Sequence, residues 1–169
     1  MKSRITKLFS ILLCICMVVS GLVIPASAAE ATATISFAST ANRTVYTTTQ
    51  QVWVQNGITV TNDKASSSTN VADYSNPVRF YAKSNLTIAF SSAMTKIVVT
   101  TGSTTYASAL ASSITSGATA TSSGSTVTII LTAPVNTITC TLSAQVRVKD
   151  ITVYYDDSVG CEITVNYAA

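Results

Sequence analysis

The chain has 169 residues and a formal net charge of +3, with ten basic residues, seven acidic residues and no histidine. It is rich in Ser and Thr but poor in the histidines, paired carboxylates and thiolates that catalytic sites usually use, so we do not expect an enzyme. Only two cysteines lie outside the N-terminal segment, and without histidine they cannot complete a tetrahedral zinc site. Composition therefore favours a protein that binds over one that catalyses.

The first 28 residues predict a cleaved secretion signal. Basic residues at the start precede an apolar run over 8–24, and the small residues Ala26 and Ala28 then form a signal-peptidase site. The leader carries three of the basic residues, which leaves seven basic and seven acidic residues in a neutral mature chain. A neutral chain lacks the basic surface of a nucleic-acid binder, and after cleavage it has no expected membrane anchor. We expect a secreted, extracellular protein.

After the leader, the sequence predicts β-strands almost throughout, because short runs rich in Thr, Val, Ile and aromatic residues recur along it. These runs are 32–37, 52–55, 58–62, 78–82, 86–90, 96–101, 126–131, 135–142, 145–155 and 162–167. Asn56-Gly57 supplies the two positive φ angles of a type I′ hairpin, and a single short helix is expected around 106–114. The sequence thus predicts an all-β fold over 29–157, an antiparallel β-sandwich of jelly-roll-like type.

Other segments break this regular pattern. The polar stretches 63–76 and 112–125 predict long loops or edge ribbons. In 145–155 the apolar residues change faces beside Asp150, which predicts a β-bulge there or a bend between two strands. The tail 158–169 has two interpretations: a final strand added to the domain, or the first strand of a truncated second module.

Cys140 and Cys161 are the pair that remains after the leader is removed. A disulfide between them would close a loop of about 20 residues in an oxidising compartment. The alternation of Ile138, Cys140 and Leu142 along one strand face favours instead a buried free thiol. Both interpretations stay open at this point.

No cofactor is expected, although a structural calcium ion is an alternative. Oxygen-bearing side chains of Asn62, Asp63, Asp73 and Asn76 fall in one loop region, and loops of sandwich domains often bind such ions. The spacing does not follow a dedicated calcium loop, so we expect a protein without metal.

The candidate ligand-binding residues are Trp53, Asp73, Tyr74, Arg79 and Tyr81. An exposed aromatic ring packs against the apolar face of a sugar, while Asp and Arg bind its hydroxyl groups. Two structural alternatives stand beside this hypothesis. A strand tryptophan is often part of a sandwich core, and Arg79 could pair with Asp73 instead of contacting a ligand.

The segments 41–58, 71–81, 95–99 and 144–148 carry a resemblance that spans most of the mature chain. They resemble an uncharacterised β-sandwich accessory module of secreted and surface proteins from gut-type Gram-positive bacteria. The resemblance implies an extracellular domain of unknown function that accompanies other domains of a larger secreted protein.

These observations lead to two functional hypotheses. The first is a secreted, non-catalytic, carbohydrate-binding-like module that recognises a polysaccharide or another cell-surface glycan. The alternative is a structural or adhesive surface module without a small ligand, which would use its exposed strand edges.

Overall fold

The computed structural model describes residues 30–157. The predicted leader, the predicted strand 162–167 and Cys161 lie outside the described residues. Strands make up 59% of the described residues and helical turns 10%, which confirms the predicted all-β, sandwich-like fold with one short α-helix. The elements in chain order are β1 (Glu30–Ser36), η1 (Thr40–Asn42), β2 (Arg43–Tyr46), β3 (Gln50–Gln55), β4 (Ile58–Asp63), β5 (Val78–Phe80), β6 (Asn85–Thr101), α2 (Thr104–Ser113), β7 (Ala118–Ser123), β8 (Thr126–Thr141) and β9 (Val146–Asp156).

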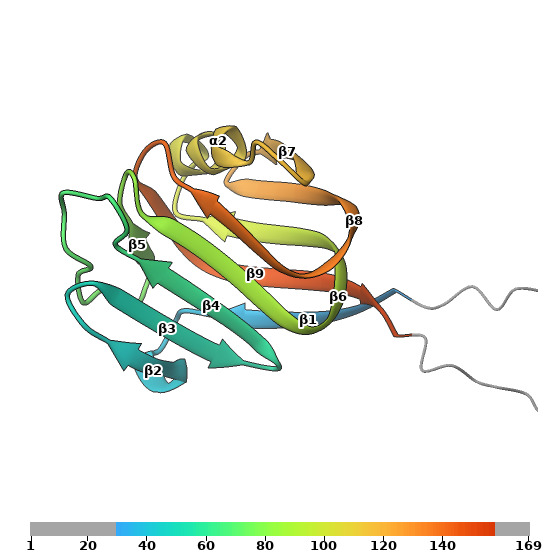
Figure 1. Cartoon of the computed structure of the whole chain (residues 1–169), viewed down its shortest axis with the longest axis horizontal. Coiled ribbons are helices and arrows are strands. Elements are labelled where there is room, and N and C mark those ends of the chain that lie inside the picture. The colour runs from blue at the N-terminus through green and yellow to red at the C-terminus, as the bar shows by residue number, and fades with distance from the viewer. Residues whose placement is uncertain (1–29, 158–169) are drawn as a thin grey trace, which may run out of the picture.

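The strands form one antiparallel sheet that curls strongly upon itself (Figure 1). β6 and β8 pair along most of their lengths and take part in both halves of the curl. The first part of β6 also pairs with β4, which continues to β3 and β2, whereas its last part pairs with β9, which continues to β1. β5 pairs with the beginning of β9, and β7 pairs with β8.

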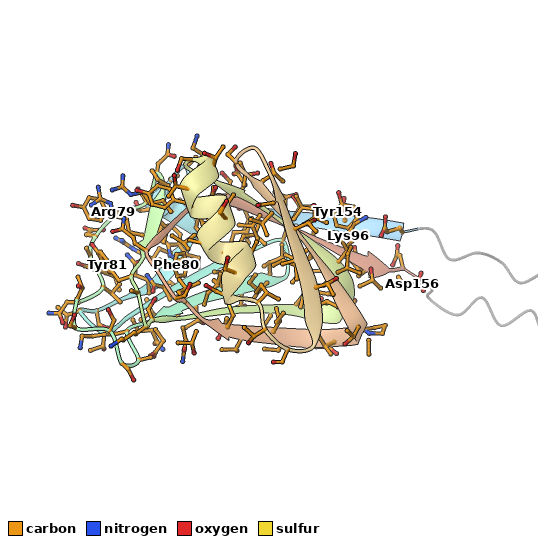
Figure 2. The ribbon with its side chains drawn as sticks, turned by 90° about the horizontal axis from the view of Figure 1, so that it is seen from above. Arg79, Phe80, Tyr81, Lys96, Tyr154 and Asp156 are labelled. Carbon is orange, nitrogen blue, oxygen red and sulfur yellow. The ribbon has the colours of Figure 1, made fainter. Side chains whose placement is uncertain are left out.

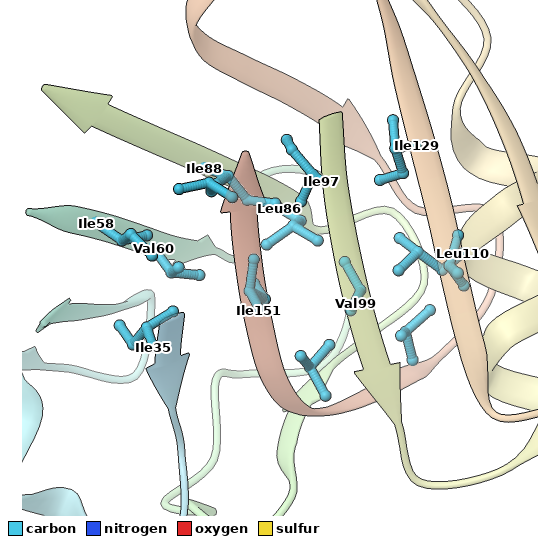
Figure 3. Close-up of a cluster of buried hydrophobic side chains, with 14 of the residues drawn as sticks. Ile35, Ile58, Val60, Leu86, Ile88, Ile97, Val99, Leu110, Ile129 and Ile151 are labelled. Atoms are coloured by element: carbon cyan, nitrogen blue, oxygen red, sulfur yellow. The ribbon is translucent and has the colours of Figure 1, made fainter. Parts of the chain in front are cut away.

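The core lies between the two halves of the curled sheet and receives alternate residues from most of the strands (Figure 3). Ile58 and Val60 come from β4, while Ile35 and Ile151 come from β1 and β9, and all four are fully buried. Helix α2 adds Ala107 and Leu110 to the same core. The strand period of two residues explains why polar residues, many of them Thr, alternate with these core residues at outward positions.

The predicted Asn56-Gly57 hairpin is confirmed. Both residues have positive φ angles, 52° and 77°, and Gln55 pairs with Ile58 across the turn. The hairpin also covers the free edge of β1: the Gln55 Oε1 atom accepts a hydrogen bond from the Ser36 N–H at 2.8 Å. The Asn56 Nδ2 atom donates to the Thr34 carbonyl at 2.9 Å. A turn that is defined by local sequence therefore helps to close one side of the sandwich.

The predicted bulge near Asp150 is confirmed as well. Asp150 pairs with Thr100 of β6, but the next residue of β6, Thr101, pairs with Val148, so the register shifts by one residue. Lys149 is the extra residue of β9, and its carbonyl accepts from the Phe37 N–H at 2.9 Å. The shift returns apolar residues to the core on both sides of the bulge, because each extra residue reverses the facing of those that follow.

Several boundaries differ from the predictions. The runs 86–90 and 96–101 belong to the single strand β6, and 126–131 and 135–142 belong to β8, because the polar residues between them continue along the curled sheet instead of forming turns. β2 was not predicted as a strand. β7 lies in a stretch predicted as a loop or edge ribbon and pairs only with β8, as a ribbon does. Across residues 30–157, no helix is long and apolar enough to cross a membrane.

Candidate functional site

The candidate site lies at the β5 end of the sandwich, which we define as the loop 64–77, β5 and the first turn of α2. Figure 2 shows Arg79 and Tyr81 at this end, with Lys96, Tyr154 and Asp156 at the opposite end. Arg79 projects outward because its strand neighbours Val78 and Phe80 are fully buried. The local sequence Val-Arg-Phe therefore places one arginine on the surface by strand alternation alone.

Two buried amide side chains hold the backbone of this end in place. Gln51 and Asn62 pair across β3 and β4 and are 0% and 1% exposed. The Gln51 Nε2 atom donates to the Ala72 carbonyl at 3.0 Å. The Asn62 Nδ2 atom donates to the Arg79 carbonyl at 3.0 Å. The residues before and after the Asn76–Pro77 turn are thus attached to the same pair of strands, which makes the end of the sandwich a rigid platform.

Tyr74 and Arg79 lie against each other on this platform. The Arg79 guanidinium carbon is 3.5 Å from the centre of the Tyr74 ring, a cation–π geometry, and 41% of Tyr74 is exposed. The Arg79 guanidinium therefore covers one face of the Tyr74 ring, which the sequence predicted to contact a ligand. The pair presents N–H donors and an aromatic edge together, as a site for hydroxyl-rich or anionic ligands requires.

Arg147 and Tyr106 extend this arrangement. Arg147 of β9 pairs directly with Arg79 of β5, and its guanidinium carbon lies 5.2 Å from the centre of the Tyr106 ring in α2. Gly102 brings these elements together, since its N–H donates to the Arg147 carbonyl at 2.8 Å. Sequence analysis missed Arg147 and Tyr106. The alternation Val146-Arg147-Val148 indicates an outward arginine, but no local pattern shows that it faces Arg79.

The prediction that Trp53 contacts a ligand is corrected. Trp53 is 0% exposed and packs edge-on against Phe37 with ring centres 5.3 Å apart. It faces inward because the alternation of β3 buries Gln51 and Trp53 and leaves Val54 41% exposed. The structural alternative, a core tryptophan, is the one that the structure confirms.

Asp73 does not pair with Arg79. It forms an ion pair with Arg43 of β2, whose guanidinium carbon also lies 4.6 Å from the centre of the Tyr46 ring. This contact ties the loop 64–77 to the outer strand of the sheet. Asp73 thus supports the platform, and the structural alternative, in which Asp73 pairs with Arg79, was wrong.

Tyr81 follows β5 directly and is half-buried. Its carbonyl accepts a hydrogen bond from the Ser84 hydroxyl at 2.7 Å, within the turn that leads into β6. Part of the Tyr81 side chain is thus exposed to solvent at the β5 end. It does not place Tyr81 in the cation–π pairs described above.

The residues considered for calcium serve other contacts. Asn62 is buried and binds backbone, Asp63 accepts from the Ala65 N–H at 2.7 Å, and Asp73 pairs with Arg43. Within residues 30–157, no group of three or more acidic or cysteine side chains could hold a metal ion. The geometry thus provides no cluster of carboxylates at this end.

A small cavity of about 320 Å³ lies elsewhere, between the end of α2 and the second half of β8. Its lining is mostly serine and threonine and includes Ile138 and Cys140. Burial raises the pKa of the Cys140 thiol to about 11, so the thiol is neutral and weakly nucleophilic at physiological pH. The predicted disulfide with Cys161 involves a residue outside the described range.

Comparison with known proteins returned no matching family model, curated protein or solved structure. Function must therefore be argued from the site itself.

Proposed function

We propose that this chain is a secreted, non-catalytic binding module that recognises a polysaccharide through the β5 end of the sandwich. The single observation that carries the proposal is the contact between Tyr74 and Arg79, with the guanidinium carbon 3.5 Å from the ring centre on a rigid platform. The signal-like leader, the resemblance to an extracellular accessory module and the neutral mature chain support location outside the cell.

Rigidity of the platform supports a binding role. Binding costs less free energy when the contact groups are already ordered, because fewer side-chain rotamers are lost. The Gln51 and Asn62 amides fix the backbone beneath Tyr74 and Arg79, and the cation–π contact fixes their side chains. The exposed part of the Tyr74 ring can then pack against a sugar, while Arg79 donates to its hydroxyl or acidic groups.

A non-catalytic role follows from the chemistry of the side chains. The sequence has no histidine, and within residues 30–157 neither Arg79 nor Tyr74 forms an ion pair with a carboxylate that could act as a general acid or base. Hydrolysis of a glycosidic bond ordinarily uses two carboxyl groups on either side of that bond. Asp73, the nearest acidic residue in sequence, is held by Arg43.

A structural or adhesive module remains the second candidate because β7 offers an exposed strand edge. Among the described strands β7 pairs only with β8, and four of its six residues are exposed. Such an edge can accept a strand from another chain. This hypothesis predicts self-association or strand addition at β7 and no dependence on Tyr74.

The test is a polysaccharide-binding assay with the mature chain, using affinity electrophoresis or pull-down with a panel of neutral and acidic cell-wall polymers. We expect retention by at least one polymer, and Tyr74→Ala should weaken it about tenfold or more. Tyr154→Ala is the matched control, because Tyr154 also lies under a cation, Lys96 at 3.6 Å, but at the other end of the molecule (Figure 2). Failure of every polymer to bind would overturn the proposal.

A further inference from the structure

Arg79 and Arg147 form an unusual pair, which we call the arginine pair. They are direct partners in the antiparallel ladder between β5 and β9, so their side chains leave the sheet on the same face. Residues in this register have Cβ atoms about 5 Å apart, and like charges at such positions repel each other. A neutral mature chain therefore keeps two positive charges side by side on its surface.

Within residues 30–157, neither arginine side chain has a hydrogen-bond or ion-pair partner, and the Arg147 Nε atom is buried without an acceptor. Among residues 30–157, two other basic side chains form ion pairs, whereas three lysines (Lys64, Lys83 and Lys149) form none. Arg43 pairs with Asp73, and Lys96 pairs with Glu30 at 3.1 Å. Each guanidinium carries five N–H donors. The arginine pair thus offers several N–H donors that have no acceptor in the described part of the chain.

Aromatic rings hold both guanidinium groups. Tyr74 lies 3.5 Å from the Arg79 guanidinium carbon, and Tyr106 lies 5.2 Å from that of Arg147. Gly102 lies beside both Arg147 and Tyr106, since a Cβ atom there would be in van der Waals contact with the Arg147 Cβ at 3.5 Å and with the Tyr106 ring at 3.6 Å. Each arginine thus contacts its own tyrosine, and the ladder between β5 and β9 makes the two arginines neighbours.

We propose that the arginine pair is a binding site for the oxyanion substituents of an acidic polysaccharide, either carboxylate or sulfate. Guanidinium groups match these anions with two parallel hydrogen bonds, and an anion between two arginines would cancel their repulsion and satisfy their donors. This inference rests on the proposed function and narrows it from polysaccharides in general to anionic ones. The outer tyrosines would contact the sugar rings that carry the anion.

The test compares polymers that differ only in charge. Polygalacturonate is measured against its methyl ester, and dextran sulfate against dextran, by isothermal titration with the mature chain. We expect at least one acidic polymer to bind about tenfold or more tightly than its neutral partner, and the two arms distinguish carboxylate from sulfate. Equal affinity for acidic and neutral polymers would overturn the inference and leave the proposed function in place.

Charge variants complete the test. Arg79→Gln and Arg147→Gln should each weaken binding of the acidic polymer about tenfold or more, whereas Lys96→Gln, which removes the same charge at the opposite end, should change it less than about twofold. Arg79→Lys keeps the charge but loses the planar fork, so it should also weaken binding. Unfolding midpoints report whether each variant is folded. Arginine variants that fold and bind normally would overturn the assignment.

Polyglutamate separates this inference from the proposed function. An acidic polysaccharide that binds at least about tenfold more tightly than polyglutamate supports both proposals. Binding of polyglutamate with no binding of any polysaccharide would overturn the proposed function, while loss of that binding in Arg147→Gln would still support an oxyanion site at the arginine pair.

Discussion

Replacement of Trp53 by alanine tests the most consequential correction to the sequence-based site. The side chain is 0% exposed and packs edge-on against Phe37 at 5.3 Å, so the substitution would leave a large cavity in the core. Trp→Ala substitutions at buried positions cost about 3–5 kcal/mol, and loss of the aromatic pair places Trp53→Ala in the upper half of that range, at about 4–5 kcal/mol. That is a large fraction of the stability of a typical domain.

The measurement is urea unfolding followed by far-ultraviolet circular dichroism. Val54→Ala is the matched control: this neighbour faces the opposite side of β3 and is 41% exposed, so it should cost less than about 0.5 kcal/mol. Trp53→Phe should fall between the two, because it keeps a ring against Phe37 and also removes the indole N–H, which is buried without an acceptor.

The single tryptophan provides an independent check. Its fluorescence in the folded protein should be blue-shifted and protected from acrylamide quenching, and both properties should be lost on unfolding. A loss of polysaccharide binding in Trp53→Ala with a stability change below about 1 kcal/mol would refute the reasoning, because only an exposed ring behaves in that way.

Three further predictions follow from the same structure. Gly57→Ala should lower the free energy of unfolding in urea by about 1–2 kcal/mol, since residue 57 has a φ angle of 77° and the new Cβ would lie 3.1 Å from the Phe90 ring. An unchanged free energy of unfolding would show that a side chain at this position does not strain the hairpin. Asn62→Ala should cost about 1–3 kcal/mol, because it leaves the part-buried Arg79 carbonyl without its donor, and hydrogen exchange should increase in β5. Unchanged exchange would show that the Asn62 amide does not hold β5 in place. For Cys140, a folded-state pKa raised from 9.0 to about 11 means that the neutral thiol stabilises the fold below pH 9 and that this contribution is lost as the pH rises toward 11. The stability difference between the native chain and Cys140→Ala in reducing buffer should therefore decrease over that interval, and a constant difference would contradict the burial of the thiol.

Local sequence patterns were sufficient wherever neighbouring residues carry the information. Asn56-Gly57 predicted its hairpin because those two residues adopt positive φ angles at low cost. The exchange of faces beside Asp150 predicted the bulge because strand side chains alternate with a period of two. The apolar spacing over 106–114 predicted the only α-helix of the described residues, within two residues of its observed start.

The candidate site was only partly predictable, because its contacts join residues that are not neighbours in the chain. Alternation within β5 indicates that Arg79 points outward, but its contacts come from elements far apart in the chain. Asp73 pairs with Arg43 and not with Arg79, because the position of the loop decides which charged groups are in contact. Trp53 is buried in the core, because the pairing of β3 decides which of its faces points inward.

The sequence by itself therefore determined the fold class, the hairpin and the bulge, since each depends on the properties of adjacent residues. Only the tertiary structure decided that Arg79 and Arg147 lie opposite each other, separated by 68 positions in the chain, because the pairing of β5 with β9 depends on how the whole sheet curls. Contacts between residues distant in the chain arise from packing of the complete core, which no single segment encodes.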